Sequence, residues 1–149
     1  YFHEMPEAKV FDGVIDLMRK IKESGLKIGI VTGSAQLPLI ERVTRDFGEF
    51  LSNDQITTAY DVKHGKPNPD PYLMGLQKAG NYSPSEGIVV ENAPLGVHAG
   101  VAAGCYTVAI NSGPLADSVF LKEGANILFP TIRKFADSWE RVLERLTKC

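Results

Sequence analysis

The sequence predicts an α/β protein, a three-layer α/β/α sandwich built on a doubly wound parallel sheet. Two observations support this fold class. Short β-branched runs alternate along the chain with amphipathic segments of helical period. The expected strands are continuously apolar, which is typical of strands buried on both faces beneath helices. We therefore expect a parallel sheet with helices on both of its faces.

The first half of the chain supplies two helices and two strands. Apolar residues recur at helical spacing between Gly13 and Gly25, which predicts an amphipathic helix with a glycine stop. The β-branched run 26–31 predicts a buried strand, and the stripe over 39–47 predicts a second helix. Residues 55–59 predict a weaker strand, which leads into a loop over 61–70.

The second half continues the alternation. Residues 72–79 predict a helix, and residues 83–86 fit a capping box at a short helical turn. Strands are expected at 88–90, 106–110 and 126–129, with a small-residue helix up to Gly104 and a brief helix over 116–122. The clearest helical stripe occupies 132–146. With no internal repeat, residues 1–149 are expected to form one core domain.

Composition excludes several classes of protein. The chain has 149 residues, of which 44% are apolar and 23% charged, as in ordinary globular proteins. The net charge of −2, with both signs interspersed, lacks the basic stripe of nucleic-acid binders and membrane anchors. No apolar run is long enough to span a bilayer, and the first residues lack the pattern of a signal peptide. Cys105 and Cys149 match no metal-ligand spacing and make no disulfide framework, so we expect a cytoplasmic, reduced protein.

Polar residues follow the expected strand at 26–31. Thr32, Gly33 and Ser34 place a hydroxyl and free backbone N–H groups at the start of a helix. Such a helix terminus is a ready site for an anion, most naturally a phosphate. A simple helix cap with a tight turn would need the same residue types.

The loop over 61–70 contains one lysine between stiffening residues. Pro67 and Pro69 restrict the backbone beside Lys66, so that its ammonium group is aimed in one direction. A fixed cation next to a phosphate neutralises charge on the transferring group. The alternative is an exposed lysine in a turn.

A carboxylate and an amide follow the expected strand at 88–90. Glu91 and Asn92 offer the oxygen ligands that a hard cation such as Mg²⁺ prefers. The alternative is a helix start at which Asn92 caps the helix and Pro94 opens it. Both roles are compatible, since a cap at the edge of the sheet also faces the crevice where ligands bind.

Taken together and in this order, the three segments resemble motifs of a known family. Thr-Gly-Ser at 32–34, Gly-Lys-Pro at 65–67 with Pro-Asp-Pro-Tyr at 69–72, and Val-Glu-Asn-Ala-Pro-Leu-Gly-Val at 90–97 resemble motifs two, three and four of the haloacid dehalogenase superfamily. The likeness is greatest to its β-phosphoglucomutase-like and sugar-phosphatase members. It extends over nearly the whole chain.

The resemblance implies magnesium-dependent phosphoryl transfer through an aspartyl-phosphate on a small phosphorylated metabolite, most of all a sugar phosphate. It assigns Thr32 and the N–H groups of Gly33 and Ser34 to holding phosphate. Lys66 would shield the nucleophile and the phosphate from mutual repulsion, so Lys66 and Thr32 are the expected catalytic residues. Glu91 and Asn92 would bind Mg²⁺; Asn92 replaces the commoner aspartate, which removes one negative charge and weakens the metal site or shifts its load to Glu91.

The family's nucleophile is the first aspartate of an Asp-x-Asp-Gly-Thr motif on a central strand, and this motif is absent from the sequence. Asp12 does not replace it, because no buried strand precedes it. By the resemblance, the central N-terminal strand and a helical cap are missing, and the strand would lie between those ending at Val31 and Val90. A missing N-terminal segment or a second chain would complete the sheet, and the isolated chain is expected to be inactive.

Two other functions remain open. The chain could be a catalytically inactive phosphate-binding or scaffold fragment, which phosphate binding without turnover would reveal. A flavodoxin-like or Rossmann nucleotide binder ranks lower, because no Gly-x-Gly-x-x-Gly follows any expected strand. Phosphatase and phosphomutase are not distinguished, because the groups that separate them lie in the missing segment.

The remaining polar and aromatic residues have structural roles in this interpretation. Asp61 and Asp70 are expected to fix their loop through hydrogen bonds, and His98 is expected to be structural. Trp139 and Cys105 are expected in the core.

Overall fold

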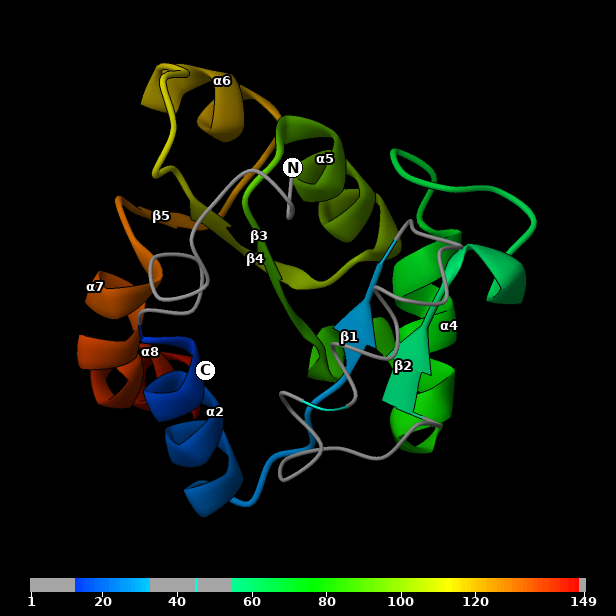
Figure 1. Cartoon of the computed structure of the whole chain (residues 1–149), viewed down its shortest axis with the longest axis horizontal. Helices are drawn as coiled ribbons and strands as arrows, with labels where there is room; N and C mark the ends of the chain where they lie inside the picture. The colour runs from blue at the N-terminus through cyan, green and yellow to red at the C-terminus, as the bar shows by residue number, and fades with distance from the viewer. Residues whose placement is uncertain (1–12, 33–44, 46–54, 148–149) are drawn as a thin grey trace.

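The computed structural model describes residues 13–32, 45 and 55–147 (Figure 1). Its strands are β1 (Ile30–Val31), β2 (Ile56–Thr57), β3 (Ile88–Glu91), β4 (Tyr106–Ile110) and β5 (Ile127–Phe129). Its helices are α2 (Val14–Glu23), α4 (Asp70–Gly80), α5 (Pro94–Ala103), α6 (Asp117–Lys122), α7 (Ile132–Asp137) and α8 (Trp139–Thr147). The short 3₁₀ turns η2 (Ala59–Asp61) and η3 (Pro84–Glu86) complete the described elements.

The strands form two parallel sheets. In the first, β1 pairs with β2, with Val31 opposite Thr57. In the second, β4 lies between β3 and β5, and Val108 stands opposite Val90 on one side and Ile127 on the other. Parallel strands joined through helices confirm the predicted α/β class.

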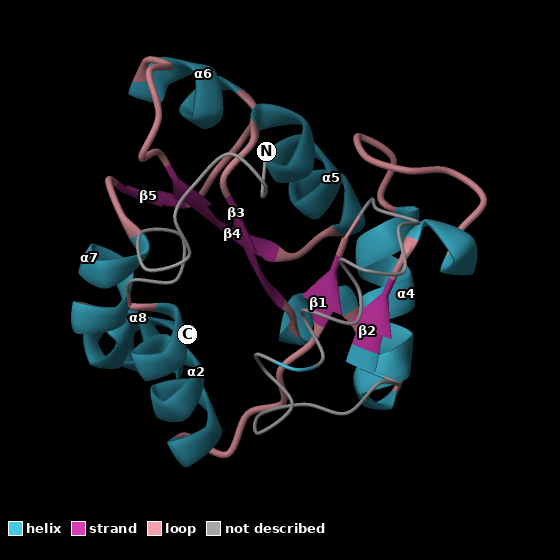
Figure 2. Ribbon diagram, in the orientation of Figure 1, coloured by secondary structure: helices cyan, strands magenta, loops and turns pink. Residues whose placement is uncertain are grey.

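Helices cover both faces of the sheets, as Figure 2 shows: α2, α7 and α8 lie on one side, and α4 and α5 on the other. The core clusters follow this division. Val108 of β4 packs with Phe135 and Trp139 beneath the first layer, whereas Ala109 packs with Phe120 of α6 and a valine of α5 beneath the second. Successive side chains of a strand point to opposite faces, so β4 serves both layers. The predicted three-layer sandwich is confirmed.

The two strands of the smaller sheet are shorter than the sequence predicts. The run 26–31 predicts one strand, but only Ile30 and Val31 join a ladder, and residues 55–59 contribute only Ile56 and Thr57 before η2 begins. Gln55 explains part of this difference. Its side-chain Nε2 donates to the Ile28 carbonyl at 2.9 Å, so that a side chain takes the place of a ladder hydrogen bond there.

The helical stripe over 132–146 is also divided, into α7 and α8. The backbone leaves the helical path at Ser138, whose φ and ψ are −101° and 2°, and its N–H donates to carbonyls of α7. Phe135, Trp139 and Val142 are nevertheless all buried, so the predicted apolar face survives the break. The helix predicted over 39–47 lies outside the described residues except for Arg45, which is helical.

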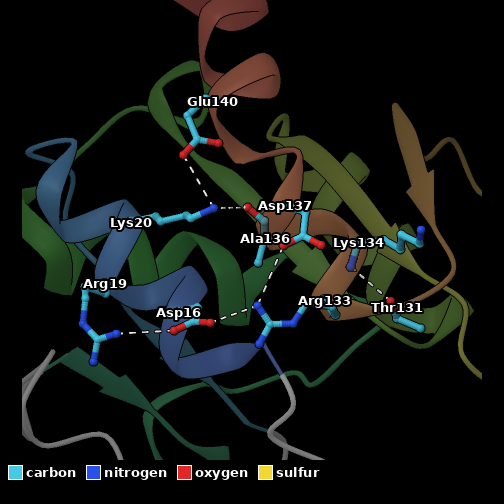
Figure 3. Close-up of polar contacts among 9 residues, drawn as sticks. All are labelled: Asp16, Arg19, Lys20, Thr131, Arg133, Lys134, Ala136, Asp137 and Glu140. Atoms are coloured by element: carbon cyan, nitrogen blue, oxygen red, sulfur yellow. Dashed lines mark hydrogen bonds and ion pairs between the residues drawn. The ribbon is translucent and has the colours of Figure 1, made fainter.

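Polar contacts join α2 to the two C-terminal helices (Figure 3). Arg133 Nη1 lies 2.9 Å from Asp16 Oδ2, and Lys20 Nζ donates to the Ala136 carbonyl at 2.9 Å. Lys20 Nζ also stands 3.5 Å from Glu140 Oε1. The hydrogen bond from Arg133 lowers the pKa of the Asp16 carboxyl below its usual value. Segments from opposite ends of the described chain are thereby held in one layer.

The edges of β1 and β3 are not paired with each other in the described part of the chain. A groove of ≈ 580 Å³ lies there, and Val31 of β1 and Val89 and Val90 of β3 contribute to its walls. Val90 lies within a strand yet is 38% exposed. This is the place at which the family resemblance implies a missing central strand. Among the described helices, none combines the length and the apolar content needed to cross a bilayer.

The loop after β2 is fixed by Asp61, as predicted. Asp61 Oδ2 accepts the Thr58 backbone N–H at 2.7 Å and lies 3.0 Å from Lys78 Nζ on α4. The hydrogen bond from Thr58, aided by Lys78, lowers the pKa of the Asp61 carboxyl. Its contribution to stability is therefore complete above the unfolded pKa of about 3.9 and is lost as the pH falls through the lower folded value.

We expect Asp61→Asn to lower the free energy of unfolding by about 1 kcal/mol at pH 7, because the charged cap and the ion pair are lost together. The difference from wild type should shrink as the pH falls below about 4, because Asp61 is protonated first in the unfolded chain and, at still lower pH, in the folded one. Urea unfolding between pH 7 and pH 3 measures both effects. Glu23→Gln, at an exposed carboxylate on α2, is the control; an equal pH dependence for both variants would contradict the assigned role.

Candidate functional site

The sequence-predicted site residues stand at the carboxyl ends of the parallel strands. Thr32 follows β1, and its backbone N–H donates to the Thr57 carbonyl at 2.8 Å, which keeps it in register with β2. Glu91 ends β3 and Asn92 follows it. The carboxyl ends of parallel strands meet at one edge of a sheet. Such sheets bind ligands in the crevice beyond this edge. Gly33 and Ser34 lie outside the described residues.

Lys66 and Glu91 form an ion pair at this edge. Lys66 Nζ lies 2.5 Å from Glu91 Oε1, and the side chains are only 21% and 9% exposed. The loop lysine thus points inward, as its proline-flanked position predicts. The sequence assigns one residue to phosphate and the other to metal, and it does not predict that they pair directly.

Hydrogen-bond donors meet both oxygens of the Glu91 carboxylate. Oε1 accepts from Lys66 and from the Tyr72 hydroxyl, the latter at 2.7 Å. Oε2 accepts the backbone N–H groups of Asn92 and Ala93 at 3.0 and 3.2 Å. A buried carboxylate is tolerated when its charge is paired and its lone pairs are satisfied. These contacts hold Glu91 in one position.

The first turn of α5 leaves room for this carboxylate only because it contains Gly96. A Cβ built on Gly96 would stand 2.0 Å from the Glu91 carboxyl carbon. The helix begins with Pro94 as predicted, but Ala93, not Asn92, occupies the N-cap position. The capping alternative for Asn92 is therefore wrong: its neighbour Ala93 takes the extended cap conformation, and Asn92 stays exposed.

Tyr72 belongs to the site, although its sequence position predicts only a helix residue. It lies in the first turn of α4, is 8% exposed, and donates its hydroxyl to Glu91. Burial, followed by the negative charge of Glu91, raises the pKa of the Tyr72 phenol far above its usual value. The hydroxyl therefore keeps its proton and remains a hydrogen-bond donor. The sequence signals for this role are its place directly after the lysine loop and its membership in the Pro-Asp-Pro-Tyr segment at 69–72.

The described residues fit a magnesium ion only in part. Asn92 is exposed and carries an amide oxygen, whereas the Glu91 oxygens are already engaged. No group of three or more histidine, cysteine or acidic side chains capable of holding a metal occurs among the residues that the structure describes. Mg²⁺ requires near-octahedral oxygen ligation, usually with carboxylates and water. A magnesium ion at these residues would need a further carboxylate from outside the described part of the chain.

The two described histidines lie apart from this network. His64 Nδ1 stands 3.5 Å from Asp70, and His98 Nδ1 stands 2.8 Å from Glu123, both on the surface. Cys105 and Trp139 are buried, as predicted. Burial raises the pKa of the Cys105 thiol, which keeps that thiol protonated.

We expect Gly96→Ala to lower the free energy of unfolding by about 1–3 kcal/mol, because the new Cβ overlaps the Glu91 carboxyl group. Gly113→Ala is a matched control, since nothing lies within 4 Å of a Cβ at that position. Urea unfolding of both variants at pH 7 provides the comparison. Equal stability of the two would show that the carboxylate can move aside.

Comparisons with known proteins show which proteins this chain resembles. A family model for haloacid dehalogenase-like hydrolases matches residues 2–104. The chain is 40% identical over 100 residues to hexitol phosphatase A of Escherichia coli. The matched region covers 67% of this chain and 45% of that protein. It is 31% identical over 134 residues to validoxylamine A 7′-phosphate phosphatase of Streptomyces hygroscopicus subsp. limoneus. This matched region covers 87% of this chain and 62% of that protein.

Solved structures show the same likeness. A protein assigned as a β-phosphoglucomutase from Bacteroides vulgatus superposes with a TM-score of 0.83 at 48% identity, over 90% of this chain and 54% of that one. β-Phosphoglucomutase from Clostridium difficile gives a TM-score of 0.71 at 26% identity, over 91% and 56%. The predicted superfamily and its sugar-phosphatase and phosphoglucomutase-like subgroup are confirmed. The chain spans about half to three-fifths of the length of these relatives.

Proposed function

Because this chain belongs to the haloacid dehalogenase-like hydrolases, an enzyme family, we propose that it serves magnesium-dependent phosphoryl transfer on a small sugar phosphate. The observation that carries the proposal is the partly buried Lys66–Glu91 pair at the carboxyl edge of the parallel sheets. A cation held at this edge is placed to neutralise a phosphoryl group. The names of the relatives, a hexitol phosphatase and β-phosphoglucomutases, support the substrate class.

In this proposal Lys66 and Thr32 are the catalytic residues of the chain. Thr32, with the backbone N–H groups of Gly33 and Ser34, holds the phosphate, and Lys66 neutralises its charge. Asn92 offers an amide oxygen to Mg²⁺, and Glu91 contributes negative charge beside it. When bound, the metal supplies further charge neutralisation to the phosphoryl group.

We place the nucleophile on a strand that occupies the groove between β1 and β3. Both flanking sheets are parallel and the groove is largely apolar, so it suits one extended apolar segment. We propose that this strand is part of a polypeptide segment outside residues 1–149, from the same protein or a second chain. Its aspartate oxygen would bond to phosphorus as the sugar oxygen leaves with a proton; water would then release phosphate and regenerate the carboxylate.

The isolated 149-residue chain should show no magnesium-dependent hydrolysis of a generic aryl phosphate, because it lacks the nucleophile motif. A colorimetric assay with and without Mg²⁺ measures this. Turnover that co-purifies with the chain and disappears in Lys66→Ala would contradict the proposed location of the nucleophile.

The same chain should bind inorganic phosphate, and Lys66→Ala should weaken that binding about 10-fold, because a charge-assisted contact is lost. Calorimetric titration at pH 7 and low salt provides the measurement. Lys63→Ala, an exposed lysine of the same loop, is the matched control and should change the affinity little. Equal losses in the two variants would show that only general positive charge matters.

A second candidate is a catalytically inactive phosphate-binding or scaffold fragment. It would hold if no other polypeptide segment supplied the nucleophile motif that residues 1–149 lack. A purified sample that contains only the 16.3 kDa chain, binds phosphate and turns over no sugar phosphate would support this candidate.

A further inference from the structure

Tyr72 contacts both members of the partly buried Lys66–Glu91 ion pair. Its hydroxyl donates to Glu91 Oε1 at 2.7 Å, the same oxygen that pairs with Lys66. The Lys66 ammonium nitrogen also stands 5.2 Å from the centre of the Tyr72 ring, within the range of a cation–π contact. One side chain thus supports the lysine in two ways, directly through its ring and indirectly through the carboxylate.

The lysine needs this support because its stem is long and flexible. A free lysine side chain samples many rotamers, and its ammonium group can donate in several directions. Its position is therefore defined only if its partner is itself fixed. Two backbone N–H groups hold Glu91 Oε2, and Gly96 allows the carboxyl group to lie against α5. Among the described contacts, Tyr72 is the group other than the lysine that restrains Oε1.

We propose that Tyr72 is a positioning residue of this site: its hydroxyl and ring together set where the Lys66 ammonium stands relative to a bound phosphoryl group. The phosphoryl part of this inference rests on the proposed function. The positional part rests only on the contacts of Tyr72, Glu91 and Lys66.

A purely structural role is the competing explanation. Tyr72 lies in the first turn of α4, so its hydrogen bond also fastens that helix to the end of β3. That role would predict a loss of stability in a variant but no change in the motion of Lys66. The two roles therefore differ in a spectroscopic property of the lysine.

The test uses the full 149-residue chain with isotope-labelled lysine, and Lys66→Arg assigns the Lys66 signals. Tyr72→Phe removes the hydroxyl and keeps the ring, whereas Tyr72→Leu removes both. Tyr82→Phe, at an exposed tyrosine just beyond α4, is the control. For each chain, the order parameter of the Lys66 Cε group, the dissociation constant for inorganic phosphate and the urea midpoint are measured at pH 7.

We expect the Lys66 order parameter to fall in Tyr72→Phe and further in Tyr72→Leu. The dissociation constant for phosphate should rise about 3- to 10-fold in Tyr72→Phe, because a hydrogen bond to a charged group is lost. The control should match wild type in both quantities. An unchanged order parameter in Tyr72→Phe, with a lowered urea midpoint, would overturn the inference and leave Tyr72 as a helix anchor.

Two further outcomes keep the inference and the proposed function separate. If Lys66 loses order in the variants but wild type binds no phosphate, the positioning role is supported and the proposed function fails. If neither variant folds, nuclear Overhauser contacts between the Lys66 methylene protons and the Tyr72 ring protons in wild type decide the question. Their presence supports the proposed arrangement, and their absence overturns it.

Discussion

The structure depends first on β4, which among the strands of the described residues has hydrogen-bonded neighbours on both sides. Val108 and Ala109 are both 0% exposed, one beneath each helical layer. A strand of this kind offers no face to water, so its side chains must all be apolar or internally satisfied. Thr107 obeys the second condition, because its hydroxyl donates to the Cys105 carbonyl at 3.0 Å. The position of β3, and with it Glu91, follows from pairing with this strand.

The site at the end of β3 shows how a buried charge is accommodated. Removing a carboxylate and an ammonium group from water is costly, and their mutual attraction alone often fails to offset that cost. Here Glu91 receives hydrogen bonds at both oxygens, from Lys66, Tyr72 and two backbone N–H groups. Loss of one partner would leave a charge poorly compensated. Geometry is therefore tightly specified at this edge, which suits a role in orienting a ligand.

The facing edges of β1 and β3, by contrast, are not paired with each other in the described part of the chain. Backbone groups at a strand edge seek partners, and an apolar groove beside such edges favours occupation by another strand. Val90 is 38% exposed within a strand whose neighbour Val89 is only 6% exposed. The proposed strand would cover this wall and bring its aspartate to the edge where Lys66 stands. The proposed strand thus connects the groove with the Lys66–Glu91 ion pair.

Much of this protein follows from its sequence, because continuously apolar strands and helical periodicity are local properties that specify an α/β sandwich. The capping box at residues 83–86 and β4 at 106–110 agree with the structure for the same reason. The order of the three motif segments along the chain also predicted that Lys66 and Glu91 lie at the carboxyl edge of the sheet. Only tertiary structure decided how short β1 is, that the last helical stripe breaks at Ser138, and that Tyr72 joins the site. Those features depend on partners distant in the chain, such as Glu91 for Tyr72, and no local pattern encodes which groups long-range packing will bring together.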